Sequence, residues 1–131
     1  MKYLPFIYGA YGSNLNKAQM QRRCPDAVPL DEPYLLNGYA LKFRGVADIE
    51  RSQSETVTLG LWHITQGCLE ALDYYEGFPS LYRRESVAIH ESGVPVMVYI
   101  MNRQEQIYPP AQHYLQAITD GYSDFGMRKE E

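Results

Sequence analysis

Residues 6–16, Phe-Ile-Tyr-Gly-Ala-Tyr-Gly-Ser-Asn-Leu-Asn, join an apolar run to an abrupt turn built from Gly, Ser and Asn. The apolar residues from Tyr3 to Tyr8 predict a short strand buried on both faces. Asn16 is a favoured N-cap residue, and Gln19 three positions later resembles a capping box. A helix is therefore predicted from about Lys17 to Arg23, ending before a proline.

The turn between this strand and this helix is suited to binding a negatively charged group. The first turn of a helix offers unpaired N–H donors and the positive end of its dipole, where a carboxylate can sit. Gly9 and Gly12 allow a close backbone approach, and Ser13 and Asn14 add polar side chains. An ordinary capped turn with no ligand is the alternative interpretation of the same residues.

Length, charge and cysteine content exclude several classes of protein. The chain has 131 residues, 45% of them hydrophobic, which predicts one globular domain over residues 1–131 with a frayed tail at 126–131. A net charge of −4 without a basic stripe argues against a nucleic-acid partner. No apolar run could span a bilayer, and no signal-peptide cleavage site is evident. Cys24 and Cys68 lack histidines at metal spacing, so we expect a reduced, cytoplasmic protein without a structural metal.

The remaining patterns predict an α+β domain with five or six strands and about three short helices, enough strands to curl into a small mixed β-barrel. Strands are expected at residues 34–44, 56–64, 82–90 and 94–101, the last two joined by a hairpin turn. The polar segment Gly45–Glu55 is expected to be a loop. A last helix is expected to open at Pro109-Pro110 and to end at Gly121.

The helix expected from the cap Thr65 to Glu76, with Gly77 as its stop, carries an acid in an unusual position. At about 100° per residue, one side of this helix faces the core and includes Cys68, Leu69, Leu72 and Tyr75. Glu76 falls within this stripe, at the negative end of the helix dipole. Burial and the dipole both raise a carboxyl pKa, and an acid held near neutrality can take and return a proton. A frayed last turn with Glu76 in water is the alternative.

Other polar residues give weaker signals. Asp73 lies at the edge of the apolar stripe and is expected to be solvated. Tyr82 follows the loop after Glu76 and either shares a pocket with it or packs in the core. Arg83 and Arg84 point to opposite faces of one strand. The chain has twelve tyrosines, and a tyrosine can line a pocket with an apolar ring and a polar hydroxyl group.

Several motifs of the chain resemble the γ-glutamylcyclotransferase-like family. The first is Tyr11-Gly12-Ser13-Asn14-Leu15, and the others follow in order at Gly60–Thr65, Leu72–Gly77, Tyr82–Arg84, Pro109–Tyr114 and Gly121-Tyr122. The resemblance therefore covers nearly the whole chain. It implies a compact mixed barrel with flanking helices.

The resemblance also implies a site. The loop of Tyr11, Gly12, Ser13, Asn14 and Leu15 would bind a γ-glutamyl group, Glu76 would be the catalytic acid/base, and Tyr82 and Tyr99 would be pocket tyrosines. No cofactor or metal is implied. Ser-Asn after Tyr-Gly looks more like the enzymes acting on γ-glutamyl amino acids than the γ-glutamylamine branch.

The implied reaction is the intramolecular cyclisation of a γ-glutamyl amide of an amino acid, peptide or amine to 5-oxoproline, as in glutathione metabolism. The expected partner is a small γ-glutamyl substrate, with neither nucleic acid nor membrane, and the expected state is a monomer or homodimer. The alternative is a non-catalytic module that binds a small metabolite in the same pocket. A protein-interaction domain would instead require a sizeable exposed apolar patch.

Overall fold

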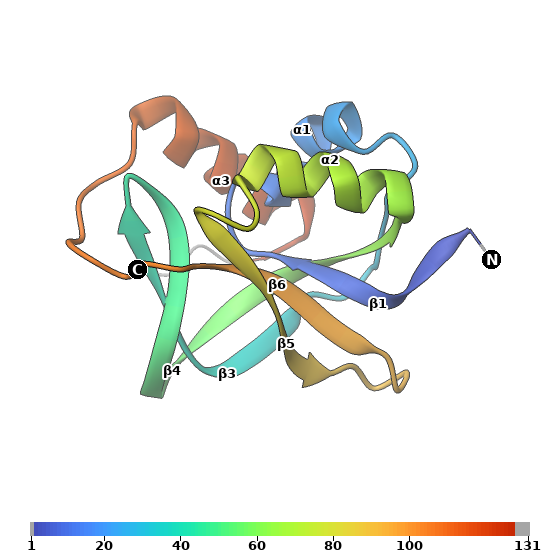
Figure 1. Cartoon of the computed structure of the whole chain (residues 1–131), viewed down its shortest axis with the longest axis horizontal. Helices are drawn as coiled ribbons and strands as arrows, with labels where there is room; N and C mark the ends of the chain where they lie inside the picture. Colours follow the sequence, from blue (N-terminus) through green and yellow to red (C-terminus); the bar gives the residue numbers. More distant parts are fainter. Residues whose placement is uncertain (1, 128–131) are drawn as a thin grey trace.

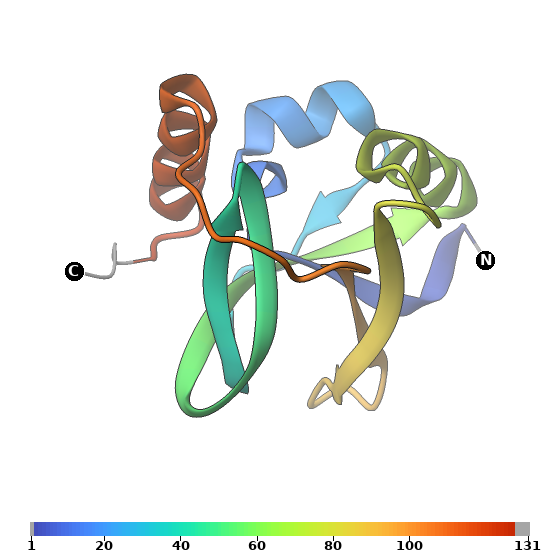
Figure 2. The ribbon, with the colours of Figure 1, turned by 60° about the vertical axis from the view of Figure 1, so that its left-hand side comes forward.

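A curled β-sheet with three helices on one side makes up the computed structural model, which describes residues 2–127 (Figures 1 and 2). The strands are β1 (Tyr3–Ala10), β2 (Val28–Pro29), β3 (Tyr34–Arg44), β4 (Val46–Thr65), β5 (Tyr82–Ile89) and β6 (Pro95–Met101). The helices are α1 (Lys17–Arg23), α2 (Gln66–Glu76) and α3 (Gln112–Asp124), and η1 (Ser13–Leu15) is a single 3-10 turn.

The sheet has six strands and mixed pairing, which confirms the α+β prediction. Its path is β2-β4-β1-β6-β5, and β3 pairs with β4 outside this path. The sheet curls like a barrel, but no ladder within residues 2–127 joins β5 to β3 and closes it. Residues 128–131 of the predicted tail lie outside the described part of the chain.

Strand β1 lies in the middle of the sheet and leads directly to the Gly-Ser-Asn turn. It pairs antiparallel with β4 and parallel with β6. Its last four residues, from Ile7 to Ala10, are all buried, so both faces are covered there. The first half of the predicted buried strand, Tyr3–Phe6, is only partly buried, and Pro5 is exposed. The turn that follows is therefore anchored to the buried end of β1.

The prediction of a loop at Gly45–Glu55 is wrong. After a tight turn at Gly45, whose φ is 81°, β4 runs without a break from Val46 to Thr65. Its first part pairs antiparallel with β3, from Val46 opposite Arg44 to Leu59 opposite Tyr34, with a register shift between Asn37 and Tyr39 that places residues 52–55 outside the ladder. The polar stretch 51–55 lies mostly exposed at the outer end of this two-stranded ribbon, away from the helices (Figure 2). An antiparallel ribbon tolerates polar side chains where a face is solvated, so the polarity was misleading.

Helices α1 and α2 begin and end where their capping residues predict. The Asn16 side chain accepts a hydrogen bond from the Gln19 N–H at 3.0 Å, and the Thr65 hydroxyl accepts one from the Cys68 N–H at 3.2 Å. Gly77 ends α2 in the left-handed conformation, with a φ of 73°. Glu76 is therefore the last residue of an intact helix, and its alternative as part of a frayed turn does not apply.

The prediction that Gly121 ends the last helix is wrong, because α3 continues to Asp124. Gly121 is buried where α3 meets the 3-10 turn η1. A Cβ atom at this position would lie 2.5 Å from the carbonyl carbon of Leu15. The role of this glycine is therefore to permit close packing, and it does not end the helix.

No helix formed by residues 2–127 is long and apolar enough to cross a bilayer.

Candidate active site

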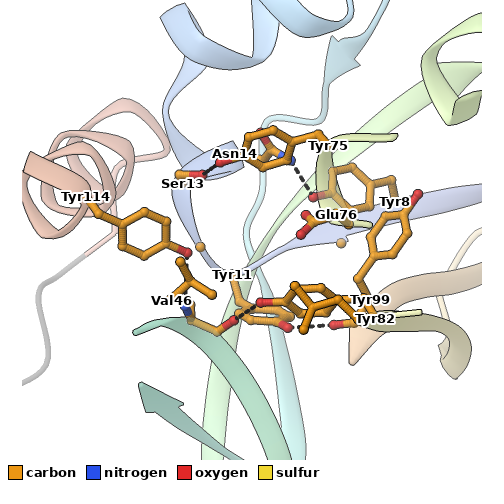
Figure 3. Close-up of a pocket in the computed structure, with 14 residues that line it drawn as sticks. Tyr8, Tyr11, Ser13, Asn14, Val46, Tyr75, Glu76, Tyr82, Tyr99 and Tyr114 are labelled. Atoms are coloured by element: carbon orange, nitrogen blue, oxygen red, sulfur yellow. Dashed lines mark hydrogen bonds between the residues drawn. The ribbon is translucent and has the colours of Figure 1, made fainter. Parts of the chain in front are cut away.

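A cavity of about 210 Å³ lies between η1, the end of α2, α3 and the strands of the sheet (Figure 3). Fourteen residues line it: Tyr8, Gly9, Tyr11, Gly12, Ser13, Asn14, Val46, Ala47, Tyr75, Glu76, Leu81, Tyr82, Tyr99 and Tyr114. Six of the chain's twelve tyrosines are among them. The cavity brings the two strongest sequence signals, the Gly-Ser-Asn turn and Glu76, to one place.

Glu76 points its carboxyl group into this cavity (Figure 3). Burial raises its pKa from 4.5 to about 7, and the nearby Arg23 guanidinium opposes part of that rise. The carboxyl group forms no hydrogen bond or ion pair with any residue between 2 and 127. It is therefore a carboxyl that titrates near neutral pH and has its oxygen atoms free for a ligand.

The turn Gly12–Asn14 lines the same cavity. The hydrogen bonds that close this turn are donated by the two residues after it. The Leu15 N–H donates to the Gly12 carbonyl and the Asn16 N–H to the Ser13 carbonyl, both at 3.0 Å. Leu15 does not line the cavity, because its side chain is fully buried in the core. Within the predicted loop, Leu15 thus anchors the turn while the preceding residues face the ligand space.

The predicted pocket tyrosines Tyr11, Tyr82 and Tyr99 all line the cavity, but their hydroxyl groups bind protein atoms. Tyr11 donates to the Tyr99 carbonyl at 2.5 Å, and Tyr82 donates to the Ala47 carbonyl at 2.6 Å. Tyr99 donates to the Asp73 carboxylate at 2.7 Å. Burial raises the pKa of all three hydroxyls above the usual value, which keeps them protonated. These residues shape the cavity with their rings.

The prediction that Asp73 is solvated is wrong. Its carboxylate accepts the Tyr99 hydrogen bond and forms an ion pair with Arg84 at 3.6 Å. The Arg84 guanidinium in turn lies 4.2 Å from the ring centroid of Phe78. The edge of the α2 stripe faces β5 and β6, where these partners reach it. Asp73 therefore holds the end of α2, and with it Glu76, against the sheet.

Residues 8–120 match the sequence profile of the family described as gamma-glutamyl cyclotransferase, AIG2-like. The chain belongs to this family. A search of curated proteins found no match.

Several solved structures share the fold of this chain. One named gamma-glutamyl cyclotransferase is 25% identical with a TM-score of 0.81, over 92% of this chain and 80% of that one. An uncharacterised human protein is 26% identical with a TM-score of 0.80, over 92% of this chain and 80% of that one. YkqA from Bacillus subtilis is 27% identical with a TM-score of 0.74; the match covers 90% of this chain and 48% of YkqA.

In this cyclotransferase-family member, two residues that line the cavity, Tyr75 and Tyr114, and Arg23, which contacts Tyr75, do not stand out in the sequence. Tyr75, expected to face the core, is 43% exposed; its hydroxyl lies 3.0 Å from the Ser13 hydroxyl, and the Arg23 guanidinium lies 3.6 Å from its ring centroid. Tyr114 accepts a hydrogen bond from the Ala47 N–H at 3.0 Å. The abundance of tyrosine is the one signal that could have pointed to two of them. No three His, Cys, Asp or Glu side chains within residues 2–127 are grouped as metal ligands.

Proposed function

We propose that this chain cyclises a γ-glutamyl amide to 5-oxoproline and releases the free amine, with Glu76 as the general acid/base. The observation that carries the proposal is a carboxyl group that forms no hydrogen bond or ion pair with residues 2–127 and has a pKa of about 7, in a small cavity that the Gly12–Asn14 turn also lines. At neutral pH such a group is present in both protonation states, which suits a residue that must accept and return one proton.

The proposed reaction needs no water, protein nucleophile or cofactor in its balance. The Glu76 carboxylate takes a proton from the substrate's α-ammonium group, and the resulting amine attacks the substrate's own γ-carbonyl carbon. A new C–N bond closes the five-membered ring and gives a tetrahedral intermediate. Protonated Glu76 then returns the proton to the leaving nitrogen as the original amide C–N bond breaks and the carbonyl re-forms. The ring nitrogen passes its remaining extra proton to the released amine, which departs as an ammonium ion.

The turn Gly12–Asn14 is proposed to hold the substrate's carboxylate. Its N–H groups are not used by the turn's own hydrogen bonds, which involve Leu15 and Asn16. Holding the substrate folded, with amine and carbonyl in contact, can contribute about 7–11 kcal/mol to catalysis in favourable cases. This positioning is the main service that a rigid cavity can provide to an intramolecular reaction.

The cavity size supports an amino-acid-sized acyl group. Its volume of about 210 Å³ is smaller than the ~300–1,000 Å³ usual for drug-sized ligands. The leaving group would therefore extend outside it. Because Ser-Asn follows Tyr-Gly, as in enzymes acting on γ-glutamyl amino acids, we propose an amino acid or peptide as the leaving group and a role in cytoplasmic glutathione metabolism.

The test is a panel of γ-glutamyl amino acids, γ-glutamylamines and glutathione, with 5-oxoproline as the measured product. We expect release from at least one class and loss of that release in Glu76→Gln, which keeps the shape of the side chain. Glu70→Gln, at an exposed position of the same helix, is the matched control. Binding across the panel without turnover would favour the non-catalytic metabolite-binding module instead.

A further inference from the structure

The hydrogen bonds of the cavity tyrosines divide them into two groups. Tyr11, Tyr82 and Tyr99 each donate their proton to a protein acceptor, so none of them has a proton left for a ligand. In the second group the hydroxyl oxygen accepts: that of Tyr114 from the Ala47 N–H at 3.0 Å, and that of Tyr8 from the Asn14 side-chain nitrogen at 2.9 Å. The direction of that bond decides what the Tyr8 proton can do.

The direction is fixed by Arg23. Its guanidinium donates to the Asn14 side-chain oxygen, and a guanidinium has no acceptor. The amide oxygen of Asn14 therefore faces Arg23, and the NH₂ group faces Tyr8. Since an amide N–H can only donate, the Tyr8 oxygen accepts and its own proton stays unused. No acceptor within residues 2–127 takes that proton.

The Tyr8 hydroxyl is held rigidly at the cavity beside the acid. The residue is 3% exposed, and its ring packs edge-on against the Tyr99 ring, with centroids 5.8 Å apart. Burial, and then the charge of Glu76, raise the pKa of Tyr8 well above the usual value, so the hydroxyl stays protonated. Tyr114, which accepts the Ala47 N–H, lies across the cavity from Tyr8 (Figure 3).

We propose that Tyr8 is a second catalytic residue, which donates a hydrogen bond to the γ-carbonyl oxygen as negative charge develops on it, and that Arg23 and Asn14 are its positioning residues. The hydrogen-bond chain runs from Arg23 through Asn14 and Tyr8 to the substrate oxygen. Each bond in such a chain polarises the next, and a cationic first donor strengthens the last one. No covalent bond of Tyr8 is made or broken. This inference rests on the proposed cyclisation.

Two substitutions test the chain of hydrogen bonds. Tyr8→Phe removes the hydroxyl and is expected to lower kcat by about 10²–10³-fold, the usual cost of one oxyanion donor, with KM changed by only about threefold or less. Asn14→Asp replaces the donor by an acceptor, so the Tyr8 hydroxyl turns towards the carboxylate and is lost to the substrate. It is expected to lower kcat to a similar extent.

The double variant separates this role from a structural one. If both substitutions remove the same hydrogen bond, Asn14→Asp with Tyr8→Phe is expected to be no slower than Tyr8→Phe alone. Effects on kcat that multiply, or a Tyr8→Phe variant within threefold of the parent kcat, would overturn the proposal. Tyr34→Phe, which removes a hydroxyl outside the cavity, is the matched control. Circular dichroism melting curves check that each variant folds.

A binding measurement keeps the two proposals apart. If the parent releases no 5-oxoproline from any substrate, the proposed function fails, and calorimetric titration with 5-oxoproline then tests Tyr8. The ring carbonyl of this compound corresponds to the γ-carbonyl of the substrate. Binding several-fold weaker in Tyr8→Phe than in the parent supports the hydrogen bond. Equal affinities, or no binding by the parent, would overturn it.

Discussion

From the raised pKa of Glu76 we predict how the folding stability changes with pH, and this prediction does not depend on any substrate. In the unfolded chain the carboxyl has its ordinary pKa of 4.5, and burial in the folded chain raises it to about 7. Between these two values the folded state holds a proton that the unfolded state has released. The folded state therefore loses stability as pH rises from about 4.5 to about 7, and the loss is complete above the folded pKa.

The size of this effect follows from the two pKa values. One pKa unit corresponds to about 1.4 kcal/mol, so the change from 4.5 to about 7 corresponds to about 3 kcal/mol. Glu76→Gln carries no ionisable group and avoids this cost. We expect the variant to match the parent in unfolding free energy below the unfolded pKa and to exceed it by about 3 kcal/mol at alkaline pH.

The assay is urea unfolding of parent and variant at several pH values, followed by circular dichroism. The control is Glu70→Gln, because that glutamate is exposed on the same helix and its removal changes the net charge equally. A gain at alkaline pH shared by both variants would be a general charge effect. If Glu76→Gln shows no gain beyond the control, the carboxyl is not held in a desolvated site, and the argument for its acid/base role fails with it.

Three further predictions concern the site and the packing that supports it. The ratio kcat/KM is expected to rise with pH up to about 7 and then level off, because Glu76 must be ionised to accept a proton. A kcat/KM for 5-oxoproline release that does not change with pH would contradict this. Gly121→Ala is expected to lower the unfolding free energy by about 1–3 kcal/mol, since the alanine Cβ would lie 2.5 Å from Leu15 atoms. An unchanged midpoint in urea unfolding would contradict this. Asp48→Ala is expected to cost about 1–3 kcal/mol, because the buried Met101 N–H loses its acceptor while Arg44 keeps its ion pair with Glu50; an unchanged unfolding free energy in the same titration would contradict the burial argument.

The sequence predicts the elements best where local chemistry decides the outcome. Asn16, Thr65 and Gly77 each form a cap or stop through their own side chain or backbone conformation, and both helices they define are correct. The stripe of α2 also places Glu76 on the correct side. These features depend on residues only a few positions apart, which is the range that a periodic pattern can describe.

The sequence fails where a distant partner decides the outcome. The polar stretch 51–55 continues a strand because β3 pairs with β4 on both sides of it, at Arg51 and at Thr56, and Gly121 lies within α3 where its missing side chain lets Leu15 pack closely. The Asp73 carboxylate on α2 is hydrogen-bonded and ion-paired because Tyr99 on β6 and Arg84 on β5 reach it. For the same reason, the hydrogen-bond direction of each cavity tyrosine is visible only in the structure.

Ala47, at the start of β4, forms hydrogen bonds with two cavity tyrosines through its backbone alone. The Ala47 carbonyl accepts from Tyr82, and its N–H donates to Tyr114. Replacing the methyl group by hydrogen in Ala47→Gly would leave both bonds in place, so that substitution would not reveal this role of the backbone. An insertion or deletion of a single residue in the hairpin at Gly45 would instead move the peptide and release both rings. A change in the length of this hairpin is thus a means of reshaping the cavity without altering any side chain in it.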